Sequence, residues 1–116
     1  MHKALAALAL LSVSTAAIAQ DESTAELTGK LTITSRNSLD PLPGEKKDRV
    51  GLFITGDSAK LLYDAMKTKP AVNVCEDGMR IKTAGALECS RGADDEYICM
   101  IAVMLATGQS RPYGAC

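Results

Sequence analysis

The 116-residue chain carries 13 basic and 14 acidic side chains, one histidine and four cysteines, and only 3% of its residues are aromatic. A nucleic-acid-binding protein would show a basic stripe with interleaved aromatic rings. This near-neutral chain lacks such a stripe, so we expect no nucleic-acid partner.

The first 19 residues predict a secretory signal peptide. Lys3 precedes an apolar stretch that ends near Val13, and small residues follow up to Ala17–Ala19, a small-x-small cleavage site. The apolar stretch is too short for a stable membrane span. We therefore expect residues 20–116 to form one small exported domain, located in the periplasm or secreted.

Four cysteines remain after cleavage, and an even number in an exported chain favours two structural disulfides. They are Cys75, Cys89, Cys99 and Cys116. None directly follows the cleavage site, so no lipid anchor is expected. We favour Cys75 with Cys89 and Cys99 with Cys116, because a tail that folds back beside the last strand brings Cys116 near Cys99. Each bond then closes a short loop. The main alternative joins Cys89 to Cys99 across one hairpin and ties Cys75 to the C-terminus.

The first regular elements are expected between residues 27 and 55. Apolar and polar residues alternate over 27–36, which predicts a half-buried strand. Prolines, a glycine and charges in residues 37–49 indicate a long loop. Residues 50–55 are apolar on both faces, as is typical of a central strand that is covered on two sides.

Residues 57–67 carry apolar side chains at helical spacing and predict an amphipathic helix that ends before Lys69-Pro70. Alternating segments at 79–83, 87–90 and 97–105 then predict an antiparallel meander. The fold class is therefore α+β, with a mainly antiparallel sheet of about five strands and one helix packed on it.

The tripeptide Gly56-Asp57-Ser58, between the strand and the helix, resembles the start of the Gly-Asp-Ser-Leu hydrolases. The resemblance covers three residues, since Ala59 replaces the leucine, and it implies a serine activated by a histidine. The only histidine, His2, lies in the predicted signal peptide. A serine–histidine–aspartate triad is therefore not expected in the mature protein.

A serine–lysine pair of Ser58 with Lys60 is also disfavoured. A lysine two positions along a helix points to a different face, and a surface lysine keeps too high a pKa to act as a base. We expect Asp57 or Thr55 to cap the helix and Gly56 to permit the tight exit from the strand.

No cofactor or metal site is expected. The carboxylates at Glu76-Asp77 and at 94–96 lack the spacing of a calcium loop. Met100 and Met104 share a strand face, but copper sites of thioethers usually recruit more ligands, so packing is the preferred interpretation.

Two surfaces are candidates for interaction. Lys46, Lys47 and Arg49, in the proline-containing loop, could contact an acidic partner or an anionic polymer of the envelope. Met100 and Met104 could form an apolar patch if no element covers their face of the last long strand.

We therefore expect a small exported, non-enzymatic binding or inhibitor-type protein that acts on an envelope or secreted protein. One alternative is a structural or accessory subunit of a cell-envelope complex. Another is a hydrolase that uses a carboxylate pair. The sequence leaves the partner and the oligomeric state open.

Overall fold

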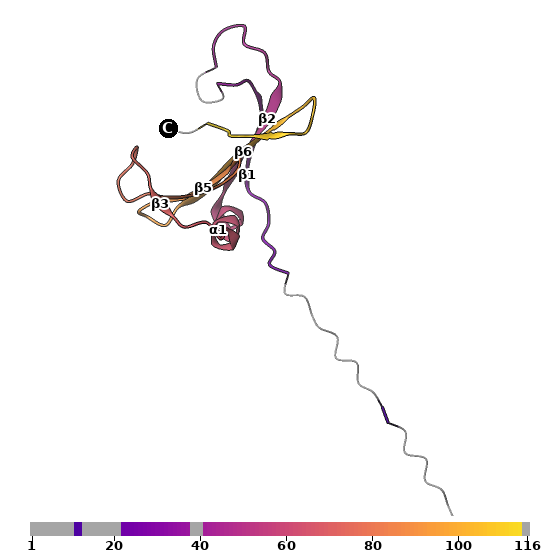
Figure 1. The fold of residues 1–116 in the computed structure, drawn as a ribbon, viewed down its shortest axis with the longest axis vertical. Coiled ribbons are helices and arrows are strands. Elements are labelled where there is room, and N and C mark those ends of the chain that lie inside the picture. The colour runs from indigo at the N-terminus through magenta and orange to yellow at the C-terminus, as the bar shows by residue number, and fades with distance from the viewer. Residues whose placement is uncertain (1–10, 13–21, 38–40, 115–116) are drawn as a thin grey trace, which may run out of the picture.

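The computed structural model describes residues 11–12, 22–37 and 41–114. Apart from residues 11–12, the predicted signal peptide lies outside the described residues, as does Cys116. The described residues form one sheet and one helix (Figure 1). The elements are β1 (Gly29–Thr34), β2 (Arg49–Thr55), α1 (Gly56–Ala65), β3 (Ala71–Val72), β4 (Arg80–Ala84), β5 (Leu87–Arg91), β6 (Tyr97–Met104) and β7 (Ser110–Arg111).

The strand order is β1-β2-β6-β5-β4-β3, with β7 also paired to β6, and every pairing is antiparallel. The predicted α+β class is confirmed. The predicted number of about five strands is too low, because the described residues form seven. β3 and β7 have two residues each and are too short to show an alternating pattern.

Helix α1 follows β2 without a loop. Gly56 has a φ of +63°, a conformation that glycine adopts readily, and this allows the sharp exit from the strand. The N-cap residue Thr55 makes no side-chain cap hydrogen bond, so the expected capping by its hydroxyl is wrong. The helix gives way to extended backbone at Met66, close to the predicted end.

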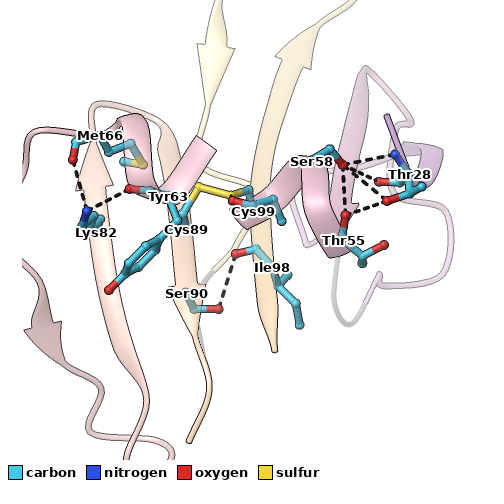
Figure 2. Close-up of a disulfide and its surroundings, with 11 residues drawn as sticks. Thr28, Thr55, Ser58, Tyr63, Met66, Lys82, Cys89, Ser90, Ile98 and Cys99 are labelled. Carbon is cyan, nitrogen blue, oxygen red and sulfur yellow. Dashed lines mark hydrogen bonds between the residues drawn. A yellow bond between two sulfur atoms is a disulfide. The ribbon is translucent and has the colours of Figure 1, made fainter. Parts of the chain in front are cut away.

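The helix packs on a disulfide. Cys89 and Cys99 are fully buried and form one cluster with Ala59 and Tyr63. Figure 2 shows the disulfide beside α1, close to Tyr63. Cys99 Sγ lies 3.4 Å from the carbonyl oxygen of Ala59, so the helix backbone touches the cross-link directly. The Tyr63 ring meets the Tyr97 ring edge-on, with centroids 5.4 Å apart. Together these groups form the buried core of the described domain.

The disulfide joins Cys89 to Cys99, so the favoured pairing of Cys75 with Cys89 and of Cys99 with Cys116 is wrong. The alternative had proposed this cross-hairpin bond. The two cysteines are directly opposite in the β5–β6 register, with Cα atoms 4.0 Å apart. The described residues contain this one disulfide instead of the two predicted. Cys75 is not a free thiol.

A lysine from β4 closes the other end of the helix. Lys82 Nζ donates to the carbonyl oxygens of Tyr63, at 2.8 Å, and of Met66, at 3.2 Å (Figure 2). The same ammonium group lies 4.3 Å from the centre of the Tyr63 ring. The last carbonyls of a helix lack partners within the helix, and they attract a cation. Lys82 therefore fixes α1 to the sheet.

The sheet face opposite the helix is covered in part by Tyr113 of the C-terminal tail. Gly51 in β2 is buried, and a Cβ placed on it would lie 2.1 Å from the Tyr113 ring. The Tyr113 ring also lies 6.5 Å from that of Phe53. The absence of a side chain at Gly51 thus makes room for Tyr113 on the sheet.

Replacing Gly51 with alanine should destabilise the domain by about 1–3 kcal/mol, because the new methyl group overlaps the Tyr113 ring. Urea unfolding followed by circular dichroism measures this loss. In the Tyr113→Ala background the same change should cost much less, and equal costs in the two backgrounds would contradict this packing.

Candidate interaction surface

Ser58 is part of the structural support of the helix. Its side chain is buried, and its Oγ donates to the carbonyl oxygen of Thr55, at 2.9 Å, and accepts from the backbone N–H of Thr28, at 3.2 Å (Figure 2). Thr28 Oγ1 donates to the same Thr55 carbonyl at 2.6 Å. This network ties the segment before β1 to the first turn of α1.

Lys60 is paired with a carboxylate. Its Nζ lies 2.6 Å from Asp64 Oδ2, one helical turn away. The hydrogen bond and charge of Asp64 raise the pKa of Lys60 above its ordinary value. A raised pKa keeps the ammonium protonated at neutral pH, so Lys60 is poorly suited to activate Ser58 as a base.

Replacing Ser58 with alanine should lower the free energy of unfolding by about 1–2 kcal/mol, because the Thr28 N–H loses its partner. Thermal or urea unfolding measures the change. Ser90→Ala is the matched control: Ser90 is also 7% exposed, but its hydroxyl makes one long bond of 3.4 Å. Equal stability of Ser58→Ala and the wild type would contradict this structural role.

The structure places Lys46, Lys47, Arg49 and Met104 around one end of the sheet, whereas Met100 lies further along β6. Arg49 and Met104 are direct partners across β2 and β6, and Met100 lies four positions before Met104 on the same face. The Arg49 side chain is only 13% exposed and is paired with Asp48 at 2.9 Å, whereas Lys46 and Lys47 are exposed. Met100 and Met104 are half-buried. The two lysines are therefore the accessible members of this predicted set.

Glu45 organises the loop that carries these lysines. Its carboxylate accepts from the Leu42 N–H at 2.9 Å and from the Asn37 amide at 3.0 Å. The Leu42 N–H, followed by the Asn37 groups, lowers the pKa of Glu45 below the ordinary value of 4.5. Because the folded pKa is depressed, this stabilisation is complete above pH 4.5 and is lost as the pH falls through the folded pKa.

Acidification should therefore release the loop. The amide NMR signals of Leu42 and Asn37 should shift together as the pH falls below 4.5, while β6 signals stay in place. In the Glu45→Gln variant the Leu42 signal should lose this transition. A transition that persists in Glu45→Gln would assign it to another group.

The open face is the part of the helix side of the sheet that α1 leaves uncovered. The strand registers align six of its side chains across β1, β2 and β6, and Leu105 directly follows β6, where its N–H bonds the Asp48 carbonyl oxygen. Leu31 is 65%, Ile33 46% and Leu105 56% exposed. α1 lies at one end of the sheet, whereas the described part of the β1–β2 loop projects at the other (Figure 1). The members are Leu31, Ile33, Val50, Leu52, Ile101, Val103 and Leu105.

Sequence reasoning missed the open face. It identified the apolar positions of each strand but expected β2 to be covered on both sides. β2 does lie inside the sheet, between β1 and β6, but Leu52 and Ile54 are only half-buried. A helix of 10 residues is about 15 Å long and cannot cover a seven-stranded sheet. That length comparison was the signal available in the sequence.

Two polar hollows lie elsewhere on the domain. One, of about 590 Å³, lies beside the start of α1, and its cations Lys60 and Arg91 are paired with Asp64 and Asp95. The other, of about 330 Å³, is lined partly by Glu76, Asp94 and Glu96, which are exposed. A general acid of a glycosidase requires a raised pKa, and these exposed positions supply no apolar enclosure for one.

No three potential metal-ligating side chains gather within the described residues, and no helix there is long and apolar enough to cross a membrane. No family model, curated protein or solved structure matches the chain. The function is therefore argued from the open face and the exposed lysines next to it.

Proposed function

We propose that the mature protein is an exported, non-enzymatic binding or inhibitor-type protein that docks an envelope or secreted protein on its open face. The exposure of Leu31 and Ile33 on one aligned apolar surface, with exposed Leu105 directly after β6, carries the proposal. Contiguous exposed apolar surface usually marks an interaction site in a soluble protein. The buried Cys89–Cys99 disulfide is compatible with an oxidising compartment.

The two exposed lysines of the loop favour a particular chemistry of the partner. The Leu105 N–H donates to the carbonyl oxygen of Asp48 at 3.0 Å, so the end of the loop meets the end of the open face. The exposed Lys46 and Lys47 lie just before Asp48 in the chain. A protein segment with apolar side chains followed by carboxylates would complement both features.

An accessory-subunit role uses the same surface with a permanent partner, so the two roles differ in the lifetime of the complex. The hydrolase alternative depends instead on a carboxylate pair, and the exposed acids of the second hollow do not favour it. The open face thus favours binding.

Affinity capture from an envelope extract, with residues 20–116 immobilised, tests the proposal. The wild type should retain a defined protein, and Leu105→Glu should lose it, because a carboxylate enters the apolar contact. Val72→Glu is the matched control: Val72 is 66% exposed but lies on β3, at the other edge of the sheet.

Exchange of both Lys46 and Lys47 for alanine should slow association and weaken its dependence on salt, as measured by surface plasmon resonance with the captured protein. Equal retention by Leu105→Glu and wild type would exclude the open face. Turnover of a substrate by the processed protein without a retained partner would favour the enzymatic alternative.

A further inference from the structure

β1 forms an edge of the sheet, and one hydrogen bond shows which of its residues direct their backbone groups toward β2. The Thr55 N–H donates to the carbonyl oxygen of Thr28 at 3.0 Å, so Thr28 faces β2. Backbone groups alternate in direction along an antiparallel strand. Lys30 and Thr32 therefore bond to β2, and the N–H and C=O groups of Gly29, Leu31 and Ile33 point away from the sheet.

The free run of this edge, meaning the stretch whose outward N–H and C=O groups are accessible, has clear limits. At its start, β1 begins at Gly29, which is the first outward-facing residue of the strand. At its end, Thr34 and Ser35 are only 5% and 1% exposed, so the chain covers them. The accessible edge therefore runs from Gly29 to Ile33. It contains no proline, and Lys30 is its one charged side chain.

We infer that this edge pairs in antiparallel fashion with the same edge of a second copy, centred on Leu31. Gly29 then lies opposite Ile33 of the second copy, Leu31 opposite Leu31, and Ile33 opposite Gly29. All outward N–H and C=O groups of the free run find partners. The interface is isologous, with the same residues contributed by both copies.

Two neighbouring registers have the same hydrogen-bond phase, and each carries a penalty. Centring on Lys30 places the two Lys30 side chains directly opposite each other, and like charges in that position are destabilising. Centring on Thr32 places Gly29 opposite Ser35, which the chain already covers. The register centred on Leu31 uses only residues of the accessible edge. It places Lys30 of one copy opposite Thr32 of the other.

The side chains also favour a second copy over an unrelated strand. The two Leu31 side chains, each 65% exposed, meet on the helix side. Ile33 of one copy lies beside Gly29 of the other, which has no side chain and is the register partner of Ile54. The pairing joins the two open faces into one apolar surface, but it does not depend on the proposed partner.

Cross-linking of cysteine variants tests both the pairing and its register. Lys30 and Thr32 are exposed, and across the interface they form a non-hydrogen-bonded pair with Cα atoms about 4.5 Å apart. Cys89 and Cys99 are bonded at a similar separation of 4.0 Å. A mixture of Lys30→Cys and Thr32→Cys chains should form the mixed disulfide in preference to either homodimer. Peptide mapping identifies the bond.

A predominant Thr32–Thr32 or Lys30–Lys30 cysteine link would overturn the register. Sedimentation equilibrium of the wild type should show a mass that approaches twice that of the monomer as concentration rises. A monomer that persists up to about 1 mM would overturn the pairing.

Leu31→Pro removes an outward N–H that does not bond β2, so the fold should be kept and association lost. Leu105→Glu should still dimerise, because Leu105 directly follows β6, which β2 separates from the β1 edge. The two proposals can therefore fail separately. If Leu105→Glu dimerises but no longer captures the partner, the open face is needed for capture and the β1 edge is still intact.

Discussion

The contact between α1 and the buried Cys89–Cys99 disulfide supports the rest of the structure. Ala59 and Tyr63 reach the cross-link only because β5 and β6 place the two cysteines directly opposite each other. A disulfide that closes a loop of this size contributes about 2–4 kcal/mol. Lys82 then closes the helix end from β4, and Ser58 secures the helix start to the segment before β1. Helix, disulfide and three strands are thus one connected unit.

The small size of that unit explains why the open face stays exposed. A single helix shields β5, β6 and the end of β2, while the C-terminal Tyr113 covers part of the reverse face at Gly51. The side chains of Leu31, Ile33 and Leu105 lie beyond the reach of both. A domain of this size has little apolar surface to spare for solvent. Exposure on one aligned face, bordered by a free edge and two lysines, therefore favours recognition over packing.

Most of the fold was predictable because its main elements are long enough to show a period. The helix was expected at 57–67 and is Gly56–Ala65, and the three meander strands lie where alternation placed them. β3 and β7 were not predicted because two residues are too few to show an alternating pattern. The disulfide was assigned wrongly because spacing alone cannot reveal which residues face each other across a hairpin. The open face required the register of three strands, which no local pattern contains.

Residue-resolved hydrogen exchange in dilute solution tests most directly the central claim that the described residues leave the β1 edge uncovered and that no other part of the chain pairs with it. The account predicts slow exchange for Lys30 and Thr32, whose amides bond β2, and rapid exchange for Leu31 and Ile33 between them. Amides of the β5 and β6 core should exchange slowest of all. Equal protection of Leu31 and Lys30 in a dilute monomer would contradict the claim, since it would mean that the chain covers its own edge.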